Sequence, residues 1–408
     1  MLYLAPTLPA LAEVVPETTK AAADTLTVCQ TGCDHTLIQD AIGSATTGDT
    51  IEVLDAVHTE SVIVVTQTLT ILGQGAANTI VQAGTLPGTA LSSVFRIDAG
   101  VTATIEGMTI RHGHVLAAAS ATAWASAQSP PLNAHVSASA GASASSLGGG
   151  VLNKGTLVLL ECEVRDNLVV AEAVAEATAE ALGEGDATAW ATAAADALAR
   201  GGAIFNQGML TVERCAITDN TAVVTVTASA HVSATSSTGV TVGENAEADA
   251  TGEALAAGIY NPGVLTITNS TISGNPAESD VSAEDDRDVA PPTVAAAQVV
   301  QGQGPGHQVV VRRVVGDGGG PIQVSSAAGD HPRRHPGTLS IQSTSSSGGD
   351  TTSATANSTG GIHSDDQATV SFATVTDNAS SASAQATSLA PRLMRTSSPA
   401  PAQPQPSQ

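Results

Sequence analysis

The stretch GGGVLNKGTLVLLECEVRDN (Gly148–Asn167) decides the fold of this chain because it recurs along the sequence without gaps. The further copies are GGAIFNQGMLTVERCAITDN (Gly201–Asn220), AAGIYNPGVLTITNSTISGN (Ala256–Asn275) and TGGIHSDDQATVSFATVTDN (Thr359–Asn378), with a looser copy, IDAGVTATIEGMTIRHG, at Ile97–Gly113. Aliphatic residues recur at fixed offsets between Gly and Asn turns. This pattern predicts an all-β solenoid in which each turn of the chain adds a parallel strand to the turn below.

The spacing of the copies is regular up to Asn275 and then nearly doubles. The copies end at residues 113, 167, 220, 275 and 378, so the successive steps are 54, 53, 55 and 103 residues. The long step predicts that one repeat is missing or damaged between Asn275 and Thr359. Residues 276–350 can be interpreted as a frameshifted repeat or as a flexible linker, and the sequence leaves both interpretations open.

Asparagine forms a column of its own in three copies, at Asn153, Asn206 and Asn261, each followed two residues later by glycine. Asparagine tolerates the left-handed conformation of a tight bend, and stacked side-chain amides can hydrogen-bond from coil to coil. We therefore expect a structural role for this column.

Inserts of similar length, residues 114–147, 168–200 and 221–255, separate the copies. In the second insert alanine occupies every odd position from 171 to 181 and from 187 to 199. Alanine favours helix by propensity, but strict period-two alternation indicates strands. We predict extended arms or hairpins, rich in Ala, Ser and Thr, that stack coil upon coil with one all-alanine face.

The N-terminal part predicts the start of the solenoid. Residues 37–45 have apolar positions at helical spacing, after Asp34 or Thr36 as a helix cap. A short amphipathic helix here would cover the open end of the coil and its unpaired edge. The predicted organisation is a signal remnant or disordered leader (1–25), the capped β-helix (26–275), the linker or damaged repeat (276–350), a last repeat (351–380) and a disordered tail (381–408).

Composition restricts the partners. The net charge is −24, and only 2% of residues are aromatic. Negative charge repels nucleic acid and anionic membranes, so neither is an expected partner. There is no apolar run long enough to predict a membrane span.

The residues resemble a known group of proteins. CQTGCDHTLIQDAIGSATTGDTIEV, TLTILGQGAANTIVQA and the copies of GGxIxNxGxLTxxxxxIxxN look like bacterial right-handed parallel β-helix proteins of the pectin-lyase-like superfamily. The resemblance covers residues 26–113 and the four repeats. It implies the fold but no single function, since that superfamily includes polysaccharide lyases, pectin esterases, glycosidases and non-catalytic surface proteins.

Enzymes of this superfamily carry acids, and often a basic residue, on the outside of a parallel sheet. The matching column here is Asp166, Asp219 and Asp377, with Arg214 as a nearby basic residue. If coils stack directly, Asp166 and Asp219 are neighbours that could bind Ca²⁺ or raise one another's pKa. The alternative is ordinary Asp–Asn turn chemistry. The histidines at 112 and 114 are expected in a solvated turn.

Four cysteines are the remaining reactive groups. The family context favours a short disulfide between Cys29 and Cys33, because exported proteins form disulfides. Cys162 and Cys215 share one repeat column, so their Cα atoms should lie about 4.8 Å apart, within disulfide range. A disulfide and a buried pair of free thiols both fit this column.

These observations predict a secreted or cell-surface protein with a structural, adhesive or carbohydrate-binding role. Its partner would be a polysaccharide or a cell-surface glycan, and no cofactor is required except Ca²⁺ under the enzymatic alternative. That alternative is a polysaccharide lyase or glycoside hydrolase; a third is a degraded reading frame. A groove of acids, arginine and exposed aromatic residues would favour the enzyme, and smooth faces of Thr, Ser and Ala the structural protein.

Overall fold

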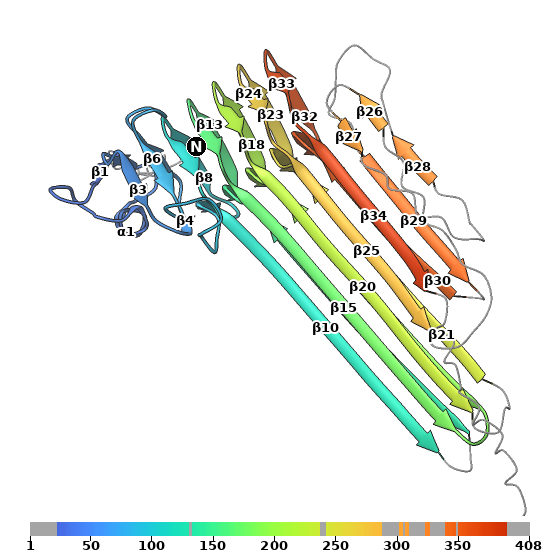
Figure 1. Ribbon diagram of the computed structural model, residues 1–408. Coiled ribbons are helices and arrows are strands. Elements are labelled where there is room, and N and C mark those ends of the chain that lie inside the picture. Colours follow the sequence, from blue (N-terminus) through green and yellow to red (C-terminus); the bar gives the residue numbers. More distant parts are fainter. Residues whose placement is uncertain are drawn as a thin grey trace, which may run out of the picture.

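The computed structural model describes residues 23–129, 133–236, 242–287, 302–304, 307–309, 323–326, 339–347 and 350–389. It has two parts, a coiled body and a long flat blade that projects from it (Figure 1). Three parallel sheets form the body, and two further sheets form the blade.

The three body sheets receive one strand from each coil. The first sheet contains β1 (Thr25–Val28), β2 (Thr50–Val53), β5 (Leu69–Leu72), β8 (Thr102–Glu106), β13 (Thr156–Leu160), β18 (Met209–Glu213), β23 (Val264–Thr268) and β32 (Ala368–Ser371). The second contains β3 (Val57–Thr59), β6 (Ile80–Gln82), β9 (Thr109–Arg111), β14 (Glu163–Arg165), β19 (Ala216–Thr218), β24 (Thr271–Ser273) and β33 (Thr374–Thr376). The third contains β4 (Ile63–Val65), β7 (Phe95–Ile97), β12 (Val151–Asn153), β17 (Ile204–Asn206), β22 (Ile259–Asn261) and β31 (Ile362–Ser364).

The repeat columns stack directly from coil to coil. Val151 pairs with Ile204 in the third sheet, and Val164 pairs with Ile217 in the second. All strand pairs of the body are parallel, and their inward aliphatic residues form one continuous core. The parallel β-helix predicted from the repeat is confirmed, with the right-handed crossover that parallel strands require.

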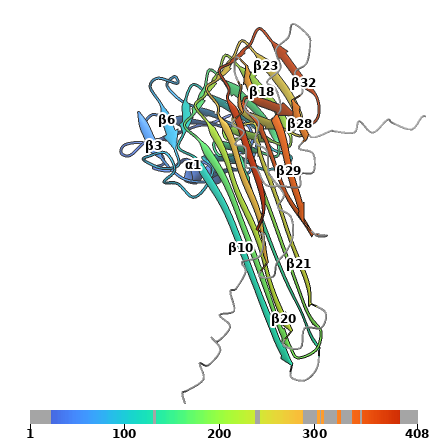
Figure 2. The same ribbon diagram turned by 45° about the vertical axis from the view of Figure 1, so that its right-hand side comes forward.

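The blade consists of the predicted inserts. Its outgoing sheet contains β10 (His114–Ser129), β15 (Leu168–Gly183), β20 (Thr221–Ser236), β25 (Ala277–Arg287) and β34 (Ser380–Leu389). Its returning sheet contains β11 (Ala134–Leu147), β16 (Ala187–Arg200), β21 (Val242–Leu255), β30 (Asp350–Thr359), β29 (Leu339–Ser347) and β28 (Gln323–Ser326). A strand of 14–16 residues is about 50 Å long, so the blade extends far from the body (Figure 2).

The two blade sheets pack face to face through alanine. Their buried side chains are Ala at nearly every position, with a few Val such as Val169 and Val226. The predicted stacking and the alanine face are confirmed. The inserts form strands despite the high helix propensity of alanine, because alternation lets every inward alanine bury its methyl group against the opposite sheet.

The long step in the repeat has a different explanation from the one predicted. The last coil stacks directly on the coil before it, with Ile259 paired to Ile362, so the described stack has no vacant coil. β25 pairs with β34 and β21 pairs with β30. The additional residues therefore lie between the outgoing and returning strands of one arm. Most of them lie outside the described residues, and the choice between frameshift and linker stays a prediction.

The boundaries predicted for the C-terminal part also differ from the structure. Residues 277–287 and 350 belong to regular strands of the blade rather than to an irregular linker. Residues 381–389, expected in a disordered tail, form most of β34. Two further short strands, β26 (Gly302–Gly304) and β27 (His307–Val309), form an antiparallel pair. The predicted leader lies almost entirely outside the described residues.

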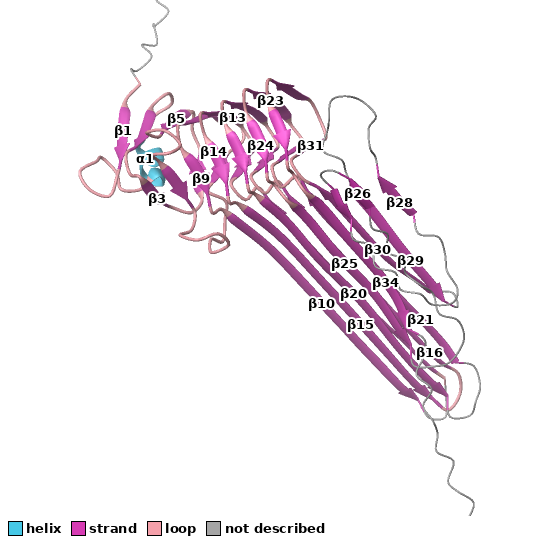
Figure 3. Cartoon of the chain, turned by 45° about the horizontal axis from the view of Figure 1, so that its top comes forward, coloured by secondary structure: helices cyan, strands magenta, loops and turns pink. Residues whose placement is uncertain are grey.

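The predicted helix, α1 (Ile38–Ser44), covers the N-terminal end of the body (Figure 3). Its N-cap residue is Leu37, and no local side chain caps it. The carboxylate of Glu60 instead accepts hydrogen bonds from the Ile38 and Gln39 N–H groups, at 2.7 and 2.9 Å. The predicted cap Asp34 accepts hydrogen bonds from Thr27. The cap therefore comes from a residue of the following coil.

Candidate functional site

The predicted aspartate column forms corners of the coil. Asp166, Asp219 and Asp377 have φ angles of 53°, 58° and 54°, the left-handed region that short polar side chains tolerate best. Each precedes an asparagine of a coil-to-coil ladder. Asn167 donates to Asn220 over 2.9 Å, for example. This geometry supports the turn interpretation of the column.

The charges around that column are arranged in local ion pairs. Arg165 pairs with Asp166, whereas Arg214 pairs with Glu161 at 3.0 Å and with Glu213. Arg214 and Asp219 are therefore not brought together as a catalytic pair. Among the described residues there is no group of three or more His, Cys, Asp or Glu side chains placed to hold a metal ion. Asp166 and Asp219 supply two carboxylates, whereas Ca²⁺ takes six to eight oxygen ligands.

His112 and His114 are buried, which corrects the expected solvated turn. The Nδ1 atom of His112 lies 3.0 Å from the Gly84 carbonyl oxygen. That of His114 lies 3.0 Å from the Ala90 carbonyl oxygen. Both rings thus fasten the loop between β6 and β7 to the body, a structural role.

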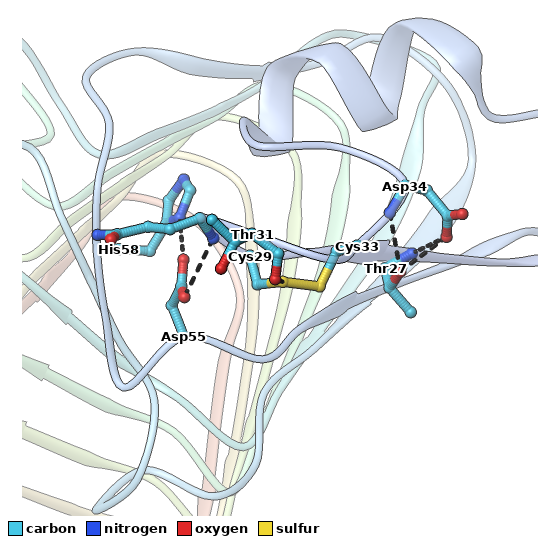
Figure 4. The surroundings of a disulfide bond; sticks show 8 residues. Thr27, Cys29, Thr31, Cys33, Asp34, Asp55 and His58 are labelled. Carbon is cyan, nitrogen blue, oxygen red and sulfur yellow. Dashed lines mark hydrogen bonds and ion pairs between the residues drawn. A yellow bond between two sulfur atoms is a disulfide. The ribbon is translucent and has the colours of Figure 1, made fainter.

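The cysteines take two different forms. Cys29 and Cys33 are joined by a disulfide with a Cα–Cα distance of 5.5 Å, close to Asp55 and His58 (Figure 4). Cys162 and Cys215 are free thiols buried in the body. The hydrogen bond with Cys215 and burial raise the pKa of Cys162 well above its ordinary 9.0. A neutral, buried thiol is a poor nucleophile, so Cys162 serves packing.

A cluster of aromatic and charged residues, which the sequence analysis missed, lies on the side of the third body sheet that faces away from the coil core, where Phe205 and Tyr260 are buried. The rings of Phe205 and Tyr260 stack with centroids 5.4 Å apart, and Tyr260 stacks on His363 at 5.0 Å. Arg200 lies over the Tyr260 ring at 5.1 Å. Asp365 accepts a hydrogen bond from the Tyr260 hydroxyl at 2.6 Å and lies 2.8 Å from the His363 ring. We call these five residues the tyrosine cluster.

The pKa shifts of Tyr260 and Asp365 do not suit these two groups to proton transfer near neutral pH. Burial and the hydrogen bond to Asp365 raise the pKa of Tyr260 to about 12. Burial opposes ionisation of Asp365, but hydrogen bonds from Tyr260 and His363 outweigh it and lower its pKa below 3.8. The tyrosine stays protonated and the aspartate stays ionised, whereas a general acid or base works best with a pKa near the operating pH.

The two tryptophans of the chain mark the outer faces of the blade. Trp124 on β10 is 65% exposed, and Trp190 on β16 is 58% exposed. β10 and β16 belong to opposite sheets that pack through their alanine faces, so the two indole rings stand on opposite sides of the blade. Both lie in the half of the blade nearer its tip.

Hydroxyl groups surround each tryptophan. The local sequences are nearly identical, ATAWASA at residues 121–127 and ATAWATA at 187–193. Because side chains two residues apart share a face of a strand, hydroxyl residues flank each ring along its strand. Across the sheet, Trp124 pairs with Thr178, and Trp190 lies between Ser137 and Asn245. An apolar ring within a rim of hydrogen-bonding groups suits a ligand with apolar faces and hydroxyl edges.

Both missed features left signals in the sequence. The tyrosine cluster occupies the variable position of G-x-I-x-N, which changes from Leu152 to Phe205, Tyr260 and His363 in successive copies. The tryptophan motif occurs twice within the inserts. Neither sequence signal reveals which residues surround these side chains, since the neighbours depend on how the sheets stack.

The comparisons with known proteins add little. No family model matches the chain, and no curated protein matches it. Among solved structures, the chain is similar to a pectin methylesterase described as in complex with hexasaccharide VII, with 13% sequence identity and a TM-score of 0.29. The alignment covers 64% of this chain and 71% of that chain. This similarity is too low to carry an argument about activity. Among the described residues, no helix is long and apolar enough to cross a membrane.

Proposed function

We propose that the protein is a non-catalytic β-helix of the pectin-lyase-like superfamily that binds a polysaccharide with the faces of its blade. Its role would be structural or adhesive, at the surface of a bacterial cell or outside it. The observation that carries the proposal is the exposure of Trp124 and Trp190 on opposite faces, each within a rim of hydroxyl groups. An indole ring can pack against the C–H face of a sugar while the rim bonds its hydroxyl groups.

Two further observations support this function. The Cys29–Cys33 disulfide fits an oxidising compartment outside the cytosol. The outer blade faces carry rows of Ser, Thr, Asp and Glu, as in Thr225, Ser229 and Glu176, which suit a solvated surface and a neutral rather than an anionic glycan. Since the chain carries a net charge of −24, an acidic polysaccharide would be repelled.

Intrinsic fluorescence tests the proposal directly, because the chain contains only two tryptophans and both belong to the proposed site. The full chain is titrated with a panel of neutral and acidic polysaccharides while emission is recorded. We expect a blue shift with a neutral polysaccharide, since the sugar removes water from the indole rings. Absence of any binding across the panel would reject the proposed function.

A variant separates tryptophan binding from general adsorption. Trp124→Ala with Trp190→Ala should weaken binding by at least tenfold in affinity electrophoresis, about 1.4 kcal/mol. Leu182→Ala is the matched control, because it removes another exposed apolar side chain of the blade. Unchanged affinity in the double variant would show that the tryptophans do not form the site.

A second candidate function, hydrolysis or lysis of a polysaccharide, is favoured by the tyrosine cluster. It places Arg200 and the ionised Asp365, which are both partly exposed, beside the buried ring of Tyr260. Turnover is followed as unsaturated uronate and as new reducing ends, with and without Ca²⁺. Turnover abolished by Asp365→Asn would establish this activity at the cluster, and turnover abolished by Asp219→Ala would establish it at the aspartate column.

A further inference from the structure

Within the described residues, the two edges of the blade differ: both sheets end at the N-terminal edge with β10 and β11, whereas at the opposite edge the outgoing sheet ends with β34 and the returning sheet continues past β30. At the bare N-terminal edge, β10 and β11 each have a single strand neighbour, β15 and β16, within the described residues. At the other edge of the returning sheet, β29 and β28 continue beyond β30 as antiparallel strands (Figure 1). The difference leaves the N-terminal side of the blade with two unpaired strands of 16 and 14 residues.

The backbone of β10 presents alternate residues to this edge. The Leu168 N–H donates to the Gly113 carbonyl, so the odd-numbered residues of β10 face β15. The His114 N–H points the other way, to the Ser92 carbonyl. The even-numbered residues that follow therefore direct their N–H and C=O groups to the open side. Such a row is a template for another strand.

Side-chain burial shows the same asymmetry. The core-facing alanines of β10 are only partly buried, whereas the alanines of β15 are fully buried. At the opposite edge, Ala382, Ala384 and Ala386 of β34 are buried. The alanine core is thus open to water along β10, and one more strand on that side would close it.

The charge of this hairpin differs from that of the rest of the chain. Residues 114–147 contain no Asp, Glu, Lys or Arg, although the chain has 38 acids. The next insert, 168–200, contains six acids and one arginine. Natural proteins protect edge strands with charges, prolines or bulges, and β10 carries none of these. Two copies of so acidic a protein could approach closely only along an uncharged surface.

We propose that the β10–β11 edge binds the same edge of a second copy of this chain. Two identical edges related by a two-fold axis pair antiparallel, β10 with β10 and β11 with β11, so both blade sheets continue from one copy into the other. The arrangement completes the ladder of each sheet and buries the alanines of β10.

The position of the body selects the antiparallel arrangement. The coils formed by residues 23–113 lie on the same side of the blade base as the bare edge. A pairing with both blades in the same direction would bring the two bodies into collision there. In the antiparallel pairing, each body lies beyond the tip of the other blade, as the projecting shape in Figure 3 allows.

Proline substitutions at the edge test the proposal. Ser120→Pro and Ser139→Pro each remove an N–H that faces the open side, because the Ala134 N–H, which binds Asp186, shows that the odd residues of β11 face outward. Sedimentation velocity of the full wild-type chain should give a dimer, and the double proline variant a monomer. Ser120→Thr with Ser139→Thr, which keeps both N–H groups, should remain dimeric.

A second variant keeps the test decisive if the prolines disturb folding. Ser120→Lys with Ser139→Lys retains the backbone donors and places like charges opposite one another in the dimer, so it should also be monomeric. A wild-type chain that stays monomeric at about 100 times the concentration used for the variants would overturn the proposal. So would species that grow without limit as concentration rises, because a two-fold pairing closes.

Spin labels test the direction of pairing. Labels at Thr122→Cys, near the middle of β10, should lie close together in the dimer. Labels at Gln128→Cys, near its end, should lie roughly 45 Å apart, since about 13 residues of strand separate them. The native thiols Cys162 and Cys215 are buried and should not react. Short distances at both positions would indicate a parallel pairing and overturn the antiparallel model. This outcome is independent of any polysaccharide binding.

Discussion

The body and the blade are produced by the same coils, but their cores are built from side chains of different size. The body encloses its core with three sheets, and Ile, Val, Leu and Phe fill the space between them. The blade presses two sheets together, and alanine occupies almost every inward position. The comparison shows that the cross-section sets the size of the core residue: a three-sided space needs long side chains, and two closely packed sheets leave room for one methyl group.

The largest expected effect on the free energy of unfolding comes from placing an alanine, the core residue of the blade, in the core of the body. Ile217 is fully buried in β19, so Ile217→Ala leaves a cavity and should destabilise the protein by about 3 kcal/mol. Urea unfolding measures the change. Thr218→Ala, on the outward side of the same strand, is the control and should cost less than about 1 kcal/mol. Equal effects of the two would show that the body core is not close-packed.

The second effect concerns the asparagine ladder, which the body has and the described strands of the blade lack. Asn220 is buried, accepts a hydrogen bond from the Asn167 N–H at 3.1 Å and donates to Asn275 at 2.9 Å. Asn220→Ala leaves those partners unsatisfied and should cost about 2 kcal/mol. Asn78→Ala, in an exposed turn, is the control. A loss no greater than that of the control would mean that the ladder does not stabilise the stack.

The third effect makes the blade like the body. Ala193 is fully buried between the blade sheets, so Ala193→Leu overpacks them and should cost about 1.5 kcal/mol. The adjacent Ala194 is exposed, and Ala194→Leu should leave the free energy of unfolding nearly unchanged. Thermal unfolding of both variants gives the comparison. If both tolerate leucine equally, the two sheets are not in close contact.

The smallest effect concerns the N-terminal end of the body, where α1 covers the first coils and Glu60 binds the start of the helix. Burial would lower the pKa of His58, but contacts with Glu60 and Asp55 outweigh it and raise the pKa above 6.5. Burial would raise the pKa of Glu60, but hydrogen bonds from His58 and from the α1 backbone lower it below 4.5. The contribution of His58 to the free energy of unfolding is complete below pH 6.5 and is lost as the pH rises through the raised pKa. The contribution of Glu60 to the free energy of unfolding is complete above pH 4.5 and is lost as the pH falls through the lowered pKa.

The contributions of His58 and Glu60 are therefore both complete between about pH 4.5 and pH 6.5. Glu60→Gln should reduce stability by about 1 kcal/mol in that window and by less on either side. The free energy of unfolding of the wild type and the variant is measured from pH 3 to pH 9. A difference that does not vary with pH would show that the His58–Glu60 ion pair does not stabilise the cap.

Much of the fold could be predicted because the repeat leaves few alternatives. The columns through Val151 and Val164 stack as predicted, since a coil can satisfy its edge hydrogen bonds only by pairing with an equivalent coil. The alternation of the inserts likewise predicted strands with an alanine face. The long step after Asn275 predicts a missing or damaged repeat, because residue counting cannot distinguish an absent coil from a longer arm.

The sites were less predictable. Asp166 and Asp219 stood out by type and spacing, but their backbone conformation and Arg165 identify them as corner residues. Tyr260 and His363 are separated by 103 residues and meet only because their coils stack. Type and spacing indicate what a residue can do, whereas its partners decide what it does.

The sequence by itself determined the solenoid, its coil period and the alanine face of the blade, because periodicity specifies which side of each strand is buried. Only the tertiary structure decided what meets across that solenoid. It brought Glu60 to the start of α1, placed Trp124 and Trp190 on opposite faces and left one edge of the blade bare. The physical reason is that these contacts join positions far apart in the chain, and stacking geometry alone fixes their distances.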